Sequence, residues 1–403
     1  MSRNLLGNRE LIRAFNRSTV LNNIKTAGSI ARTDLARSTG LSPATITGIT
    51  AELIEDGLVI EKASGNSRGG RRPILLALNP RGGYVVGIKL ADQMVIGALT
   101  DLEATILQKN SLVLEDHKVD TVCQTIAQIV TQLSHQASIP QGSLLGVGIG
   151  LAGIIDSSSG LLRHSPIFGW RNIPLIELLS GLLKVPIYLD NDVNTLTLTE
   201  RLFGSGQGVD HFLTVTVGRG VGLGIVVNGQ LYRGARGGAG EFGHTVIDST
   251  GPACECGKQG CLETFVSDPA MMRMAAEAYS SGELPAPVSS ITDLLELAQQ
   301  GVPPAVAIFE TAGEKLGQAI ANLINIFNPQ EVILSGEGLR AGSLLINAVR
   351  ASINRHTMSG LAEDTQLRID EWEDDAWARG AASLVLLELF KSPLHPERKE
   401  LSS

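Results

Sequence analysis

The feature that most constrains the fold is a change in hydrophobic pattern near Gly83. Before it, apolar residues recur at helical spacing in three short segments. After it, apolar runs of strand length alternate with helical segments as far as Phe390. A chain of 403 residues is too long for one small core, so we expect two or three domains. Strand hairpins followed by helices occur twice after Gly83, which predicts two α/β lobes with a cleft between them.

The composition is that of a globular protein, with 43% hydrophobic and 18% charged residues. No run of eighteen or more apolar residues is present, so no transmembrane helix is predicted. Residues 1–10 are polar and lack the apolar core of a signal peptide. We therefore expect a soluble, cytoplasmic protein.

The first eighty residues predict a winged helix-turn-helix. Residues 9–26 and 29–39 have helical periodicity, and Gly40-Leu41-Ser42 forms a turn before a third helix that ends near Gly57. Ser42 is a favourable N-cap, and Pro43 occupies the first helical position. Segments 58–62 and 73–78 are expected to pair as strands around a loop.

The third helix is the candidate recognition helix, with residues that could face DNA bases. They are small and lie at its start or away from its buried stripe: Ser42, Ala44, Thr45, Thr47 and Gly48. Thr offers a hydroxyl and a methyl group for base readout. A glycine inside a helix costs about 1 kcal/mol relative to alanine. Close approach to DNA would explain Gly48, and so would a local packing requirement.

The predicted wing is a Gly-rich loop with three cations, Arg68, Arg71 and Arg72. Arginines in such a loop suit the negative potential of a narrow minor groove. Residues 1–79 contain 11 Lys and Arg against 6 Asp and Glu, whereas the remaining residues contain 22 against 35. A basic N-terminal region followed by an acidic remainder favours double-stranded DNA as the partner of residues 1–79. The alternative is a protein-binding winged helix with a solvated hairpin loop.

Three of the four cysteines lie within eight residues, which favours metal binding over disulfides in a cytosolic chain. With one histidine they supply four ligands, His244, Cys254, Cys256 and Cys261. Four nitrogen and sulfur ligands make a closed tetrahedral site, so we predict structural rather than catalytic Zn²⁺. Reduced structural thiols are the alternative. Cys123, alone in a predicted helix, is expected in the core.

Several blocks after Gly83 resemble the ROK family of repressors and sugar kinases. The similarity is carried, in order, by residues 190–194, 220–225, Gly234, 240–244, 254–263 and Asn328-Pro329. With the DNA-binding head, the chain is most similar to the xylose-repressor branch. The resemblance implies an actin-like fold of two ribonuclease-H-like lobes, a zinc site at the matching positions, and a homodimer or homotetramer. Domains are expected at 1–79 (winged helix-turn-helix), 80–190 (first lobe, completed by a C-terminal helix at 375–392) and 191–374 (second lobe, with the zinc loop and an oligomerisation surface).

The resemblance also implies a small sugar as effector. In ROK kinases the residues matching Asn191, Asp192, Glu241, His244 and Glu263 contact sugar hydroxyls, and the one matching Asp192 is the general base. Asp192 could instead only cap a helix, and the two glutamates could be ordinary surface carboxylates. The sequence departs from the kinases at Ile167, where they commonly place a sugar-binding Asn. Trp170 could then contribute by stacking.

Kinase activity is not expected. The first phosphate turn of the kinases is replaced here by residues 89–94, which have no glycine, whereas the second, 218–224, is retained. The adenosine motif at 336–338 is partly retained. Two functions stay open: a non-enzymatic sugar-responsive regulator, or an active ATP-dependent sugar kinase with a fused DNA-binding domain. A third possibility from the family is a phosphotransferase protein, rather than a free sugar, as the effector.

Overall fold

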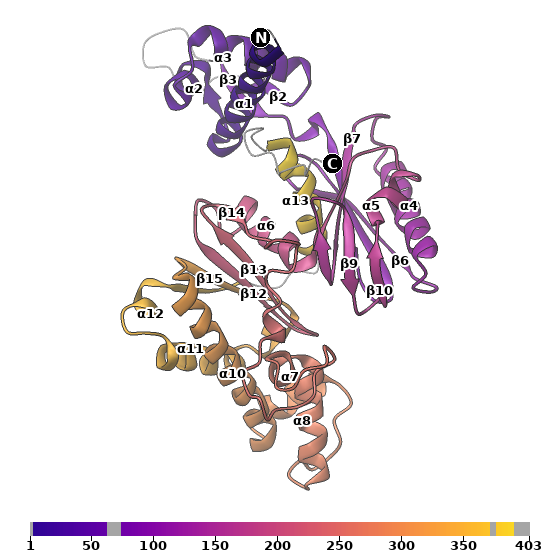
Figure 1. Ribbon diagram of the computed structural model, residues 1–403, viewed down its shortest axis with the longest axis vertical. Coiled ribbons are helices and arrows are strands. Elements are labelled where there is room, and N and C mark those ends of the chain that lie inside the picture. The colour runs from indigo at the N-terminus through magenta and orange to yellow at the C-terminus, as the bar shows by residue number, and fades with distance from the viewer. Residues whose placement is uncertain (1–2, 63–73, 371–375, 391–403) are drawn as a thin grey trace. The chain divides into compact units, whose positions relative to one another are not determined.

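The computed structural model describes residues 3–62, 74–370 and 376–390 (Figure 1). The chain forms two compact units, one comprising Met1–Asp192 with Trp377–Ser403 and the other Val193–Ala376. The chain passes from one unit to the other after Asp192 and returns after Ala376. Among the described helices, none combines the length and apolarity needed to cross a membrane.

The first unit begins with the predicted helix-turn-helix. Its elements are α1 (Arg3–Ala27), α2 (Arg32–Thr39), α3 (Pro43–Glu55), β1 (Ile30–Ala31), β2 (Val59–Lys62) and β3 (Leu75–Leu78). Ser42 caps α3 by accepting a hydrogen bond from the Thr45 N–H at 3.1 Å, as predicted. The helix expected over 29–39 begins later, because Ile30–Ala31 is a short strand paired with β3. Ile12, one of the apolar residues at helical spacing in 9–26, is 52% exposed.

The rest of the first unit is an α/β lobe whose main sheet has the order β11-β7-β4-β5-β6. Its strands are β4 (Tyr84–Leu90), β5 (Met94–Thr100), β6 (Ile106–Val113), β7 (Leu144–Leu151) and β11 (Ile187–Asn191). A smaller antiparallel sheet contains β8 (Ile154–Asp156), β9 (Leu161–Ser165) and β10 (Trp170–Ile173). The helices are α4 (Val119–Gln136), α5 (Leu175–Ser180) and α13 (Ala376–Phe390). The sequence pattern did not predict the small sheet.

Helix α13 packs directly on the main sheet, as Figure 1 shows in yellow. A Cβ on Gly87 of β4 would lie 1.9 Å from the Ala378 carbonyl oxygen, and one on Gly148 of β7 would lie 1.8 Å from that of Ala381. Because any side chain at these positions would overlap the helix backbone, the two glycines set the close helix–sheet distance. The C-terminal helix therefore belongs to the first lobe.

The second unit is built on a sheet of order β14-β13-β12-β15-β16. Its strands are β12 (Phe212–Val217), β13 (Val221–Val227), β14 (Gln230–Leu231), β15 (Glu331–Ser335) and β16 (Gln366–Ile369). Its helices are α6 (Asp192–Phe203), α7 (Glu263–Val266), α8 (Asp268–Ser280), α9 (Ile291–Gln299), α10 (Pro303–Phe327), α11 (Ser343–His356) and α12 (Leu361–Asp364), together with short 3₁₀ turns at 242–244 and 337–341.

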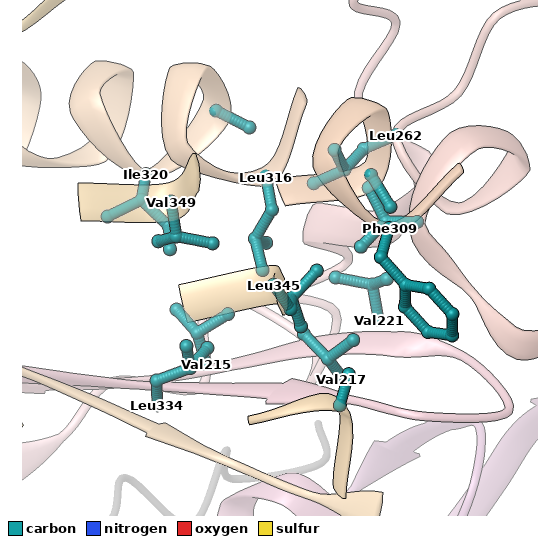
Figure 2. Close-up of a cluster of buried hydrophobic side chains, with 14 of the residues drawn as sticks. Val215, Val217, Val221, Leu262, Phe309, Leu316, Ile320, Leu334, Leu345 and Val349 are labelled. Carbon is teal, nitrogen blue, oxygen red and sulfur yellow. The ribbon is translucent and has the colours of Figure 1, made fainter. Parts of the chain in front are cut away.

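A core of buried side chains joins this sheet to the helices of the second unit. Figure 2 shows Val215, Val217 and Leu334 from the sheet beneath Leu316, Ile320, Leu345 and Val349, with Leu262 and Val221 near Phe309. Leu262 is fully buried and directly follows Cys261. The loop that carries the cysteines is therefore anchored in the core at one end.

Candidate functional site

The four predicted metal ligands come together. The ligand atoms of His244, Cys254, Cys256 and Cys261 all lie within 4.8 Å of one another. The Cys254 sulfur lies 3.5 Å from His244 Nδ1, and the Cys256 and Cys261 sulfurs are 3.6 Å apart. Tetrahedral zinc with Zn–S bonds of about 2.3 Å requires sulfur–sulfur separations of about 3.8 Å. The donor set and its spacing therefore fit a closed structural metal site.

Backbone hydrogen bonds hold this cluster in shape. Val246 and Cys261 form an antiparallel bridge, and the Cys254 N–H donates to the Lys258 carbonyl at 2.8 Å. Gly257 and Gly260 have φ angles of +88° and +67°, the left-handed conformation that lets the chain turn back on itself. The Lys258 ammonium, which the motif analysis did not single out, donates to the His244 carbonyl at 2.6 Å.

Glu263 links the Cys/His cluster to the Gly-rich turn that begins at Gly218. Its Oε2 accepts a hydrogen bond from the Val221 N–H at 3.1 Å. A Cβ on Gly220 would lie 2.9 Å from this oxygen, and one on Gly243 would lie 3.3 Å from it. The carboxylate is therefore packed against the residue before His244, and it is a positioned group rather than a free surface acid.

Glu241 precedes the 3₁₀ turn Phe242–His244 and is exposed. The residue before it, Gly240, has a φ of +95°, and a Cβ there would lie 2.0 Å from the Leu223 carbonyl oxygen. This close approach places the start of the 241–244 segment against β13. Glu241, His244 and Glu263 therefore belong to one loop cluster of the second unit.

Asn191 and Asp192 lie at the end of the first unit, where β11 runs directly into α6. The Asn191 side-chain amide donates to the Gly153 carbonyl at 3.1 Å, and its backbone N–H donates to the buried Asp190 carboxylate at 2.8 Å. Asp192 occupies the first turn of α6. Their approach to the loop cluster of the second unit stays a prediction.

Trp170 is not available for stacking on a ligand, so that expectation was wrong. It is 6% exposed and packs against Phe168, with ring centroids 4.8 Å apart. Its indole N–H donates to the His117 carbonyl at 2.8 Å. Burial and hydrogen bonding make Trp170 part of the first lobe's core, and Ile167 also packs against that core.

The segment at the position of the first phosphate turn forms a tight hairpin turn. The Ala91 N–H donates to the Met94 carbonyl at 3.0 Å, which closes the turn between β4 and β5. The ring nitrogen Nε2 of His117 lies 2.6 Å from the Asp92 carbonyl oxygen. The turn is thus held by a hydrogen bond to the His117 side chain, a contact that the sequence motifs did not reveal.

The second Gly-rich turn faces an acidic residue. A Cβ on Gly218 would lie 2.7 Å from the Glu337 carboxylate oxygen Oε2. The Asp268 N–H donates to the Gly218 carbonyl at 2.8 Å, Asp268 forms an ion pair with Arg340, and Arg340 donates to the Glu337 carbonyl at 2.7 Å. These contacts place the Arg340–Asp268 ion pair and Glu337 beside the turn. Glu337 lies in the 336–338 motif noted in the sequence, whereas Arg340 lies outside the motifs.

The predicted base-facing residues lie at the start and on the outer side of α3. Ser42, Ala44, Thr47 and Gly48 are exposed, whereas Thr45 is half-buried. Ile46, Ile49 and Leu53 form the buried stripe on the opposite side, as predicted. The wing residues Arg68, Arg71 and Arg72 lie outside the described residues.

Comparison with known proteins identifies both parts of the chain. Residues 16–60 match the winged helix-turn-helix DNA-binding family and residues 85–388 match the ROK family. The xylose repressor of Caldicellulosiruptor bescii is 32% identical over 399 residues, which cover 96% of this chain and 99% of that repressor. A solved ROK family transcriptional regulator, a homolog of the E. coli MLC protein, has a TM-score of 0.86 at 28% identity and covers 95% of this chain and 98% of its own. A ROK family glucokinase from Streptomyces griseus, solved with glucose and AMPPNP, has a TM-score of 0.65 at 28% identity; the match covers 75% of this chain and 99% of the glucokinase.

Proposed function

The chain belongs to the ROK family, and from this membership and its winged helix-turn-helix head we propose that it is a sugar-responsive repressor of carbohydrate-utilisation genes. The observation that carries the proposal is the extent of the similarity. The similarity to a repressor runs through 96% of the chain, head included, whereas the similarity to a glucokinase covers 75%. The head would bind operator DNA, and the kinase-like part would bind the effector.

We assign the effector site to Asn191, Asp192, Glu241, His244 and Glu263. Each sugar hydroxyl both donates and accepts, so carboxylates and amides at fixed positions are the groups that recognise it. The hydrogen bond from Val221 to Glu263 supports this assignment, because it holds the carboxylate in one orientation. His244 would contribute one ring nitrogen to the metal and present the other to the sugar.

The metal at the Cys/His cluster would be zinc, held by His244, Cys254, Cys256 and Cys261. A closed four-ligand site supplies no open position for catalysis, and the metal would act by cross-linking the loop. Because Glu241 and Glu263 flank the ligands in sequence, the same cross-link would hold both glutamates near the effector.

We propose that the kinase-like part does not transfer phosphate. Backbone N–H groups of a glycine turn bind phosphate only if nothing else occupies the approach. The Glu337 carboxylate beside Gly218 would repel the phosphates of ATP, and the first turn lacks glycines. Asp192 would then be retained as a polar contact to the sugar rather than as a base.

The effector would act on a homodimer or homotetramer that presents two heads to DNA. A ligand shifts such an equilibrium only by its difference in affinity between the two states. Sugar binding would therefore change operator affinity by the ratio of sugar affinities in the DNA-bound and DNA-free forms.

The proposal is tested with the purified full chain. A thermal-shift screen against common pentoses and hexoses identifies the effector, and operator affinity is then measured with and without it. A change in affinity supports the proposal, and no sugar that both binds and alters DNA affinity would refute it. A coupled assay for ATP consumption with the same sugars tests the alternative, an active sugar kinase with a DNA-binding head, for which the glucokinase match is the supporting observation.

A further inference from the structure

The inference concerns which DNA groups helix α3 reads, and it rests on the proposed DNA-binding function. Gly48 lies in the middle of α3, with its backbone φ in the ordinary helical region. A Cβ placed on Gly48 would meet no atom within 4 Å. None of the described residues therefore requires glycine here, although glycine lowers the stability of a helix interior. Packing against the described residues does not explain Gly48, which leaves close approach to DNA as the explanation.

The surface around Gly48 is a shallow groove between α1 and α3. It is lined by apolar and polar residues of both helices: Ile12, Arg13, Asn16, Thr45, Gly48, Ile49 and Glu52. Ile12 is 52% exposed, which is a large exposed fraction for an isoleucine in a helix. Gly48, which has no side chain, and Ile12 together make a small hollow that is apolar on the Ile12 side and has the Arg13–Glu52 ion pair beside it.

The polar groups of this part of α3 are already engaged. The Thr47 hydroxyl donates to the Pro43 carbonyl at 2.8 Å, so it presents its methyl group and oxygen lone pairs outward. The Ser42 hydroxyl caps the helix and also lies 2.8 Å from the Thr45 hydroxyl. No Arg, Lys, Asn or Gln lies in α3, so the bidentate contacts that read guanine or adenine cannot come from this helix.

The charged end of α3 shows which half of the helix can approach DNA. Glu52 forms an ion pair with Arg13 of α1, and Asp56 forms an ion pair with Arg17 of α1 at 2.7 Å. Glu55 is exposed at the same end. Because Glu52 and Asp56 are compensated by arginines, Glu55 is the carboxylate that would repel phosphates, and the N-terminal half of α3, which ends at Gly48, is the half that fits the major groove.

We propose that α3 recognises its operator by apolar contact, with the hollow at Gly48 and Ile12 receiving the C5-methyl group of a thymine. Thymine is the base that presents a methyl group in the major groove, and small apolar side chains are its usual partners. Sequence specificity in this helix then comes from shape and methyl contact rather than from hydrogen bonds to base edges.

The test begins by selecting an operator from a random duplex pool with the full-length chain. Each thymine of that operator is then replaced by deoxyuridine, which removes only the methyl group. The wild type is expected to lose about tenfold in affinity at one or more positions of each half-site. In Gly48→Ala the added methyl fills the hollow, so affinity for the thymine operator falls by a similar factor and deoxyuridine at that position has no further effect.

Two controls keep the outcomes distinct. Gly48→Ala is expected to keep or raise the melting temperature, so its weaker binding cannot come from unfolding. Ile12→Ala should reproduce the loss, whereas Ile326→Ala, at an even more exposed isoleucine of α10, should bind as the wild type does. Equal effects of deoxyuridine on the wild type and on Gly48→Ala, or no effect at any thymine, would overturn the inference. Failure of the wild type to select any sequence would instead refute the proposed function.

Discussion

The Glu263 carboxylate accepts a hydrogen bond from the Val221 N–H at 3.1 Å. This contact joins the end of the Cys/His loop to the start of β13, across 42 residues of sequence. Because Glu263 is a proposed sugar contact, the backbone of the Gly-rich turn would help to orient a bound sugar through this hydrogen bond.

Replacing Glu263 by Ala should lower sugar affinity at least tenfold while leaving operator affinity without sugar unchanged. The substitution removes two acceptor oxygens from the proposed site and leaves the Val221 N–H without this partner. Titration calorimetry with the identified sugar measures the loss. Glu255→Ala, at an exposed glutamate of the same loop, is the matched control and should bind sugar normally. Normal sugar affinity in Glu263→Ala would remove Glu263 from the site.

Replacing Cys256 by Ser should release the metal and destabilise the second unit by several kcal/mol, because binding to a structural site contributes directly to folding. Metal content by mass spectrometry should fall from one zinc per chain, and the melting temperature should drop. Cys123→Ala changes a buried thiol of α4 outside the cluster and should keep the zinc. Full zinc content in Cys256→Ser would contradict the four-ligand site.

Glu337→Ala should raise the affinity for a non-hydrolysable ATP analogue above that of the wild type, because it removes the carboxylate beside Gly218. Neither protein should consume ATP in the presence of sugar, since the first turn still lacks its glycines. Fluorescence titration with a labelled analogue measures the affinity. Sugar-dependent ATP consumption by the wild type would instead establish the kinase alternative.

The buried carboxyl group of Glu200 should make stability depend on pH. Burial and the neighbouring Asp370 raise its pKa from 4.5 to about 7, although the Ser205 N–H lowers it. A pKa raised by folding stabilises the protein fully below about pH 4.5, and this contribution, at most about 3 kcal/mol, is lost as the pH rises through 7. Denaturant unfolding at several pH values should show this fall.

Glu200→Gln should flatten that pH dependence between 4.5 and 7, because the amide cannot ionise. The matched control is Glu296→Gln, at an exposed acid of α9, which should unfold with the slope of the wild type. An unchanged slope in Glu200→Gln would mean that another group dominates the titration.

Much of the fold could be predicted from the sequence because its signals are local. Runs of apolar residues predict β4 and α13 with their ends nearly right, and Ser42 with Pro43 marks the start of α3. The strand β1 could not be predicted, because two residues have no periodicity and their pairing with β3 is a tertiary contact. Ile12 fits the helical stripe, yet nothing in the sequence reveals that its part of α1 extends beyond the core.

The Cys/His cluster was predictable because its four residues are close in sequence and belong to types that commonly bind metal together. The contacts that Glu337 and His117 make with their turns were not predictable, since each joins residues about 25 to 120 positions apart and no local pattern encodes it. The stacking role expected for Trp170 failed for a related reason. An aromatic residue near a site has the same local sequence whether it faces a ligand or the core.

The central claim is that a sugar bound by Glu241 and Glu263 controls the affinity of the winged helix-turn-helix for operator DNA. The most direct measurement is the operator affinity of the wild type and of Glu241→Ala, each with and without saturating sugar. The account predicts that sugar shifts the affinity of the wild type at least fivefold, while Glu241→Ala binds DNA as tightly as the sugar-free wild type and does not respond. An equal shift in both proteins would contradict it.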